Sequence, residues 1–161
     1  MNNWLETLRT KKEDRGLMAN LRCYLTESKE HRAYPYLYRL GIPIDSESKS
    51  VVAAFYAMHP VEGNLKNFGS TVRQIKETKD KKSNDRQTPT ERRFQHLLAS
   101  EPGRELFARV ARLVILAKAT GVPVNYLQLQ KDMEFWNSKT RQRWAGEFWK
   151  SSEQHQDEDA P

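Results

Sequence analysis

Residues 100–121, with the sequence SEPGRELFARVARLVILAKATG, decide the fold class because they form one long amphipathic pattern. Apolar residues recur at the 3.6-residue period of a helix and make a continuous stripe: Leu106, Phe107, Val110, Leu113, Val114 and Ala117. Ser100 is the predicted N-cap and Gly121 the predicted C-terminal end, beyond which Pro123 prevents continuation. The stretch therefore predicts a long helix with one face in a core.

Helical periodicity extends over most of the remaining chain, which has no convincing period-two run of β-branched residues. Thr88, Pro89 and Glu91 form a complete capping-box pattern, and Asn125 and Ser138 are the predicted caps of the last two helices. Earlier helices are expected at residues 2–9, 14–27, 34–40, 48–59 and 68–79. The sequence therefore predicts an all-α protein.

Composition divides the chain into two helical parts. Residues 78–88, TKDKKSNDRQT, contain no apolar side chain and are predicted to form a mobile polar connector. They separate an N-terminal helical bundle, residues 1–77, from a C-terminal helical bundle, residues 89–150. Residues 151–161, SSEQHQDEDAP, carry four acidic residues and no Lys or Arg, and are predicted to be a disordered acidic tail.

The distribution of charge favours a polyanionic partner. The chain of 161 residues has a net charge of +6, and without the acidic tail 27 Lys and Arg oppose 17 Asp and Glu, which gives +10. A field of this sign concentrates phosphate polymers around a protein. Many basic proteins carry lysines that only face water, so charge alone leaves nucleic-acid binding and a solvated surface equally open.

Arginines recur in pairs on the predicted helix faces. Arg15 and Arg22 are seven residues apart, which places them within about 20° of each other on an ideal helix. Arg109 and Arg112 lie together on the long helix, away from its apolar stripe. Each pair leaves a positively charged strip on which a phosphate backbone is able to lie.

Another pair, Arg92 and Arg93, stands near the start of a predicted helix. The helix dipole disfavours cations there by up to about 1 kcal/mol unless an anion compensates. Phosphate is such an anion, because helix N-terminal amides and guanidinium groups both bind its oxygens. The alternative is internal ion pairing with Glu91, Glu101 or Glu105.

No catalytic constellation stands out. The histidines are scattered (His31, His59, His96 and His155), without an HExxH pair or a cysteine cluster for zinc. Cys23 is the single cysteine, which excludes an internal disulfide, and its spacing favours a small buried side chain. A nuclease centred on His59 stays open, but the sequence predicts a protein that is not an enzyme and uses no cofactor or metal.

Aromatic and apolar residues point to a core and not to a membrane. Trp4, Trp136, Trp144 and Trp149 are able to stack on unpaired bases, but their helical spacing favours core packing. No apolar run reaches the length of a membrane span, and the N-terminus has no signal-peptide pattern. A cytoplasmic protein is expected.

Several short motifs follow one another in a defined order. They are DRG..A.LR from Asp14, A.HP from Ala57, N.G.T from Asn67, ERRF..LL.S from Glu91, the helix that holds Arg112, Y..L..D...W from Tyr126, and WA..FW from Trp144. With this order and spacing, the chain resembles the CasB family, the small subunit of the type I-E CRISPR Cascade complex, from Trp4 to Trp149.

The resemblance implies a non-catalytic subunit of a ribonucleoprotein that contains CRISPR RNA and other Cascade subunits, with two copies of this chain head to tail. Family members help to hold the RNA–DNA hybrid and the displaced strand of the target DNA. Carried over by position, Arg22, Arg93 and Arg112 are the first candidates for contact with nucleic acid, and Arg22 and Arg112 are expected on one continuous positive surface. The supporting candidates are Arg15, Lys49, Arg92, Arg109, Lys118, Arg141 and Arg143.

The sequence also departs from the family pattern. Cys23 stands where the family often has a second basic residue, which puts one phosphate contact in doubt. Three interpretations compete. A Cascade small subunit would co-purify with large subunits and RNA, a stand-alone helical nucleic-acid binder would bind strongly by itself, and a basic protein-interaction module would show no salt-linked affinity for nucleic acid.

Overall fold

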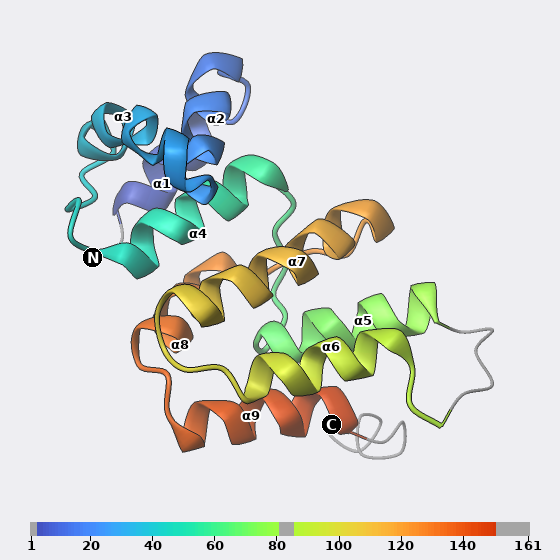
Figure 1. Cartoon of the computed structure of the whole chain (residues 1–161). Coiled ribbons are helices and arrows are strands. Elements are labelled where there is room, and N and C mark those ends of the chain that lie inside the picture. The colour runs from blue at the N-terminus through green and yellow to red at the C-terminus, as the bar shows by residue number, and fades with distance from the viewer. Residues whose placement is uncertain (1–2, 81–85, 151–161) are drawn as a thin grey trace.

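The computed structural model describes residues 3–80 and 86–150 of the chain, and most of these residues lie in helices (Figure 1). The elements are α1 (Asn3–Thr10), α2 (Arg15–Arg22), the 3₁₀ helices η1 (Cys23–Leu25) and η2 (Glu27–Ala33), α3 (Tyr34–Arg39), α4 (Glu47–Met58), α5 (Phe68–Lys79), α6 (Pro89–Leu98), α7 (Arg104–Thr120), α8 (Tyr126–Glu134) and α9 (Ser138–Trp149). Within the described ranges there is no strand, only an isolated bridge between Glu62 and Val124. The all-α prediction is confirmed.

Two of the predicted segments fall partly or wholly outside these ranges. The acidic tail, residues 151–161, and residues 81–85 of the predicted connector are not among the described residues. The beginning of that connector belongs to α5, which continues to Lys79. No helix in the described part of the chain is both long enough and apolar enough to cross a membrane.

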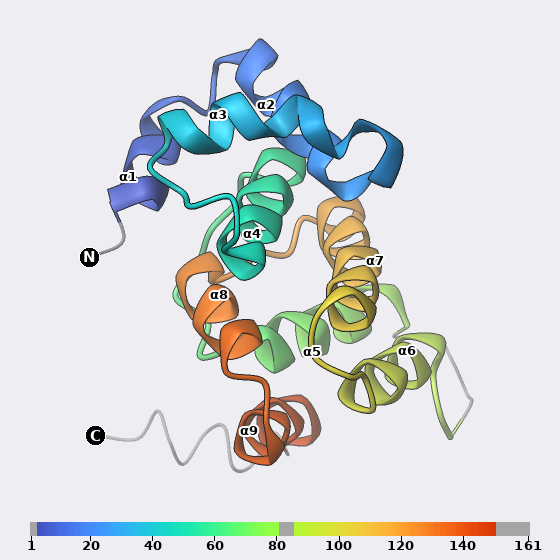
Figure 2. The same ribbon diagram turned by 60° about the vertical axis from the view of Figure 1, so that its left-hand side comes forward.

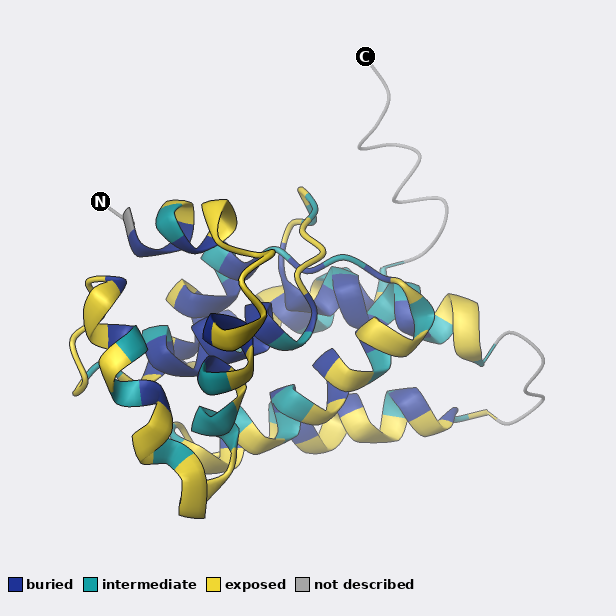
Figure 3. Ribbon diagram, turned by 90° about the horizontal axis from the view of Figure 1, so that it is seen from above, coloured by how far each residue is buried: buried dark blue, intermediate teal, exposed yellow. Residues whose placement is uncertain are grey.

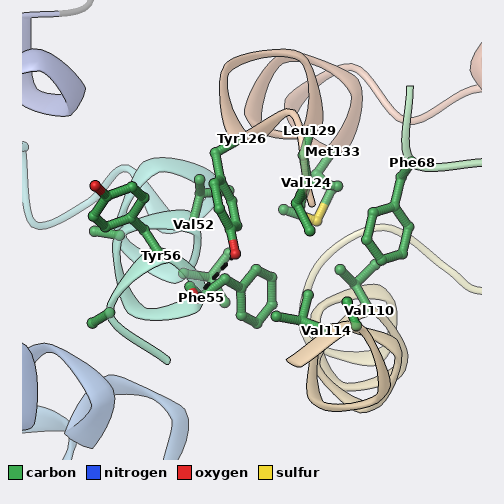
Figure 4. Packing of buried hydrophobic residues seen from close by; sticks show 14 of the residues in the cluster. Val52, Phe55, Tyr56, Phe68, Val110, Val114, Val124, Tyr126, Leu129 and Met133 are labelled. Atoms are coloured by element: carbon green, nitrogen blue, oxygen red, sulfur yellow. Dashed lines mark hydrogen bonds between the residues drawn. The ribbon is translucent and has the colours of Figure 1, made fainter. Parts of the chain in front are cut away.

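Helix α4 lies at the centre of the fold, since nearly all of its residues are buried. It packs against α2 and also against α7 and α8 (Figures 1 and 2). Figure 4 shows Phe55 of α4 beside Val114 of α7 and Tyr126 of α8, and the Tyr126 hydroxyl donates to the Phe55 carbonyl oxygen at 3.4 Å. Along the more peripheral helices, exposed and buried residues alternate (Figure 3).

Helices α5 and α9 approach each other closely at Gly69. A Cβ atom added to Gly69 would lie 2.1 Å from the carbonyl oxygen of Trp144, so the two backbones can be this close only because the residue is glycine. The buried Trp144 ring fills the space beside the crossing, with its centroid 5.4 Å from the Phe68 ring and 4.9 Å from the Trp136 ring. This packing fixes the position of α9.

Helix α5 also packs against α6 and α7, which follow it in the chain on the far side of residues 81–85. The buried apolar residues of the early and late helices form one continuous cluster. The division into bundles at residues 1–77 and 89–150 stays a prediction.

Helix ends follow the predicted chemistry at three positions. The Thr88 hydroxyl accepts from the Glu91 backbone N–H at 3.2 Å, and the Asn125 side chain accepts from the Gln128 N–H at 3.1 Å. Gly121 ends α7 with a φ of 74°, a left-handed conformation that favours glycine.

Two predicted caps are wrong. Helix α7 begins after Gly103, and the Ser100 hydroxyl donates to the His96 carbonyl oxygen at 3.4 Å. In α9 the cap is Asn137, whose side-chain oxygen accepts from the Thr140 N–H at 3.0 Å, so Ser138 is the first helical residue. Asparagine and serine are equally good caps, and the sequence by itself does not choose between such neighbours.

The expectation that aromatic residues form the core is confirmed for Trp4, Trp136 and Trp144, which are all buried. Trp149 is 43% exposed, and its indole N–H donates to Glu91 Oε1 at 2.7 Å. Cys23 is only half-buried, so the prediction of a buried cysteine is wrong. It follows α2 directly, at the edge of the buried face.

Candidate nucleic-acid interface

Helices α6 and α7 pack against each other (Figure 2). Between them lies an open hollow of about 260 Å³ that is lined by basic residues. The lining residues are Arg92, Arg93, His96, Arg109 and Arg112. On α6 the three residues share a side because His96 follows the two arginines by four and three positions, and on α7 the arginines are three positions apart. None of the lining residues is acidic, so the hollow concentrates positive charge.

The guanidinium groups of this basic hollow differ in what they contact. Arg93 and Arg112 are exposed and form no hydrogen bond or ion pair with any residue in the described ranges. Arg92 has one long hydrogen bond, 3.4 Å from its Nη2 to the Gln87 carbonyl oxygen. A guanidinium without a protein partner keeps its donors for two oxygens of a phosphate.

Arg109, in contrast, is held by the protein. Its Nη1 atom donates to the His96 carbonyl oxygen at 2.7 Å and to the Ser100 hydroxyl at 3.1 Å, and it lies 2.8 Å from Glu105 Oε1. Arg109 therefore forms an internal ion pair with Glu105, which is one of the glutamates that the sequence offered as partners for the arginines. Arg109 also joins α7 to the end of α6. Its main role is to hold the two helices together, because several of its hydrogen-bond donors are already used.

Arg141 also has a structural environment. Its Nη2 atom donates to the Ser100 carbonyl oxygen at 3.3 Å, and its guanidinium carbon lies 5.4 Å from the centre of the Trp136 ring. The Trp136 indole N–H donates to the same carbonyl oxygen at 3.0 Å. The Arg141 Nε atom is buried without a hydrogen-bond partner among the described residues. These contacts tie Arg141 of α9 to Ser100, which lies between α6 and α7, and to Trp136, and Arg141 does not line the basic hollow.

Arg143 lies in a mixed-charge setting on α9. Its side chain is 58% exposed, with Nη2 3.1 Å from the Thr140 hydroxyl and 4.0 Å from Asp132 Oδ1. Asp132 is buried and accepts from the Trp144 indole N–H at 2.8 Å. Arg143 thus compensates a carboxylate that the core already uses.

The remaining lysine candidates lie elsewhere. Lys118 is six residues beyond Arg112 on α7, which on an ideal helix turns it about 120° away from that arginine. Lys49 is half-buried near the beginning of α4. Neither lysine lines the basic hollow.

The arginines of α2 form a separate pair. Arg15 begins the helix and is exposed, and Arg22 ends it and is also exposed. The Arg22 Nη1 atom donates to the Ala57 carbonyl oxygen near the end of α4 at 3.0 Å. One side of its guanidinium is therefore held by the fold. The continuous surface expected between Arg22 and Arg112 stays a prediction, because Arg22 does not line the basic hollow.

His96 is the residue of the hollow that the sequence interpretation did not assign. It was grouped with scattered histidines, although its spacing of three and four from Arg93 and Arg92 is the helical signal for a shared face. A protonated histidine would add a further positive charge beside the arginines.

The alternative of a nuclease centred on His59 does not fit the position of that residue. His59 is buried, and its Nε2 atom lies 2.7 Å from the Val122 carbonyl oxygen. The ring therefore joins the end of α4 to the loop before α8, away from solvent. Among residues 3–80 and 86–150, no three His, Cys, Asp or Glu side chains gather as metal ligands would.

Comparison with known proteins gives agreement on fold and family. Residues 17–149 match the family model of the CRISPR-associated protein Cse2. Two crystal structures from Thermus thermophilus, one of CasB and one of a Cse2-family CRISPR-associated protein, each superpose with a TM-score of 0.71 at 21% identity, covering 92% of this chain and 94% of the other. CasB from M. ruber gives a TM-score of 0.63 at 20% identity, over 89% of this chain and 88% of the other. No curated protein sequence matches.

At identities of 20–21% the solved structures establish the fold, and the match to the family model establishes the family. The match covers most of the helical body, including α2, from Leu17 onward, and both helices of the basic hollow. The chain belongs to the Cse2 (CasB) family, the small subunit of the CRISPR Cascade complex.

Proposed function

We propose that this Cascade small subunit uses the basic hollow between α6 and α7 to bind the phosphate backbone of opened target DNA, and so stabilises the R-loop of CRISPR RNA, target strand and displaced strand. The observation that supports the proposal is the group of four arginines around one hollow without a lining carboxylate. Arg93 and Arg112 in particular have no described protein partner.

The energetics of R-loop formation make a modest contact sufficient. The heteroduplex formed with the guide is about as stable as the DNA duplex that it replaces, so the exchange is nearly balanced. The displaced strand loses its pairing partner and its phosphates need cations. A few guanidinium groups that bind them favour the open state.

Recognition at the hollow is proposed to depend on phosphate and strand shape and not on base sequence. Arginine donors without an organised set of base-edge acceptors and donors do not distinguish one base pair from another. Sequence is read by the guide RNA. A small subunit that ignores sequence serves every guide equally well.

Further parts of the proposal concern activity and assembly. The Cse2 family is a structural component of Cascade, and we propose that this chain likewise has no catalytic activity. Family membership implies association with other Cascade components and with CRISPR RNA. We further propose that this chain contacts target DNA and that two copies of it lie head to tail. Cross-linking within the assembled complex tests both points.

The affinity of the isolated protein for single-stranded DNA tests the proposal directly. Binding should be weak, independent of sequence, and steeply reduced by salt as counterion release loses its advantage. The double variant R93A/R112A should weaken binding by about tenfold or more and should make the salt slope shallower by about one unit for each lost phosphate contact.

The matched control is R32A/R39A, which removes two exposed arginines that do not line the hollow. It alters net charge by the same amount and should change affinity much less. Equal losses in the two variants would show that only total charge matters, and an affinity that does not vary with salt would refute phosphate contact.

A further inference from the structure

A different side of α7, roughly 100° around the helix from Arg112, lines a second hollow with a volume of about 240 Å³, and the lining of this hollow has the opposite charge. Its floor is apolar and includes Leu25 of η1, Val51 of α4, and Phe107 and Ala111 of α7. It lies where α7 meets the beginning of α4 and the η1–η2 segment. We name it the acidic groove.

Three carboxylates line the acidic groove: Glu27, Glu30 and Glu47. Arg104 is the single basic residue of the lining, and its Nη2 atom lies 3.7 Å from Glu30 Oε2. One ion pair therefore leaves an excess of two negative charges at the groove, on a body whose net charge is +10. The groove is therefore locally negative, although the body of the protein is positively charged.

Tyr24, which also lines the groove, reports the same negative potential. The pKa of its hydroxyl is raised to about 12, mainly by burial and in addition by the nearby carboxylates of Glu30 and Glu47. Negative charges hinder formation of a phenolate beside them. A cation bound at the groove would be favoured by the same field.

Helix α7 continues the apolar floor along its surface. Phe107, Ala111 and Ile115 are four residues apart and follow one line on the helix, and Ile115 is 52% exposed. On an ideal helix this line lies roughly 100° from Arg112, so α7 presents an apolar and acidic side and a basic side. The half-buried Phe107 and Ala111 together with the exposed Ile115 give the charged groove an apolar border that a protein partner is able to cover.

Nucleic acid does not suit this groove, because its phosphates would meet an excess of carboxylates. An isologous pair of copies with the groove on the two-fold axis does not suit it either, because the two acidic grooves would then face each other. A head-to-tail contact between two copies would leave this groove free on one of them, so a second copy is kept as an outcome of the cross-linking test below. A basic segment of a different protein meets neither objection.

We propose that the acidic groove docks a segment of another Cascade protein subunit, one in which a Lys or Arg lies beside an apolar side chain. The cation would meet Glu27 and Glu47, and the apolar side chain would cover the floor near Phe107 and Ala111. This inference rests on membership of the Cascade family and not on the basic hollow. It assigns the two sides of α7 to two kinds of partner.

A photo-crosslinking residue tests the occupant. Ala108 lines the groove and is exposed, so p-benzoylphenylalanine at this position reports what lies there in a complex reconstituted with the neighbouring Cascade subunits and CRISPR RNA. We expect a cross-link to a different subunit, at a peptide that carries Lys or Arg within two residues of an apolar side chain. A cross-link to RNA, DNA, a second copy or a peptide without a cation, or no cross-link, would overturn the proposal.

Charge reversal supplies a second test. E27K/E47K should reduce the affinity of this chain for a complex that lacks it by about tenfold or more, since like charges across an interface are strongly unfavourable. The matched control is E6K/E13K. Like Glu47, Glu6 lies in the first turn of an α-helix, and like Glu27, Glu13 lies outside an α-helix. The complex should retain this control variant as well as it retains the parent chain. Equal retention of the two variants would contradict the proposal.

These experiments distinguish an error in the proposal for the basic hollow from an error in the proposal for the acidic groove. If the acidic groove is assigned correctly, R93A/R112A keeps the Ala108 cross-link even where DNA binding is lost. If only the groove proposal is wrong, E27K/E47K assembles normally while R93A/R112A still weakens DNA binding. Thermal melting of each isolated variant shows whether the fold is intact before either result is used.

Discussion

The α5–α9 crossing and the basic hollow between α6 and α7 are both places where neighbouring helices meet, but the space between the helices is filled in opposite ways. At the crossing, Gly69 lies against the Trp144 backbone and buried rings occupy the remaining volume. At the hollow, arginine side chains border open space, and Arg93 and Arg112 have no described protein partner.

The comparison shows that the residues of the crossing are explained by folding, whereas the residues of the hollow are not. At the crossing, Gly69, Phe68 and Trp144 pack directly against one another and leave no open space for a ligand. In the hollow, like charges stand near one another without a lining carboxylate, which is unfavourable for the isolated protein. An external polyanion removes that cost, so the hollow is where a ligand is expected to contribute most.

The largest expected effect is on the crossing. Gly69→Ala would place a methyl group 2.1 Å from a backbone oxygen, so α5 and α9 have to move apart. We expect a loss of about 3 kcal/mol or more in the free energy of unfolding, or failure to fold. Denaturant unfolding with circular dichroism measures this, and Gly146→Ala, where an added Cβ meets nothing within 4 Å, is the control. Equal stability of the two variants would show that the crossing is looser than described.

A smaller effect should separate two kinds of arginine at the hollow itself. Arg109→Ala removes the hydrogen bonds that Arg109 donates to the His96 carbonyl oxygen and the Ser100 hydroxyl, and also the ion pair with Glu105, so we expect a loss of about 1–2 kcal/mol in unfolding free energy. R93A/R112A should stay within about 0.5 kcal/mol of the parent, because exposed arginines contribute little to stability. If R93A/R112A is the more destabilised variant, those side chains have structural partners and the hollow is not a free site.

The smallest effect concerns Asp80, which ties the end of α5 to the beginning of α6. Its Oδ2 atom accepts from the Thr90 N–H at 3.2 Å. Burial by itself would raise the pKa of this carboxyl, but hydrogen bonds from Thr90 and Thr88 outweigh it and hold the pKa below the ordinary 3.8.

Because the folded-state pKa is lowered, the stabilisation by Asp80 is present above pH about 4 and is lost as pH falls through the folded value. Asp80→Asn should lower Tm by about 2–4 °C at pH 7 and by less at pH 3, where the parent carboxyl is itself becoming protonated. Thermal melts at several pH values measure the difference. A difference that grows on acidification would reverse the sign and refute this role.

Local patterns predicted most of the helices, but the helix expected over residues 14–27 is wrong in its extent, because α2 ends at Arg22 and the 3₁₀ helices η1 and η2 follow. The 3.6-residue period located the long helix and Gly121 located its end, because both signals lie within the segment that folds. The caps at Thr88 and Asn125 were predicted for the same reason. The shared side of Arg92 and Arg93 with His96 was readable in the same way.

Contacts between distant segments were not predictable. The Ser100 carbonyl oxygen accepts from Trp136 and Arg141, which are 36 and 41 residues away, and no local pattern announces such a partner. For that reason Arg141 and Arg112 looked alike in the sequence, although one is held by the core and the other is exposed. Which arginines are available to a ligand depends on tertiary structure.

Permanganate footprinting of target DNA opened by the reconstituted complex tests the central claim most directly, with guide-RNA retention measured beside it at two salt concentrations. The hollow variant R93A/R112A is compared with the control R32A/R39A. The account predicts normal retention of RNA by both variants and reduced reactivity of the displaced strand for the hollow variant only. The deficit should be smaller at the higher salt, because phosphate contacts contribute less there. A hollow variant that loses RNA while its assembled fraction opens DNA normally would show that the basic hollow holds the guide, and would contradict the assignment of the displaced strand as its ligand.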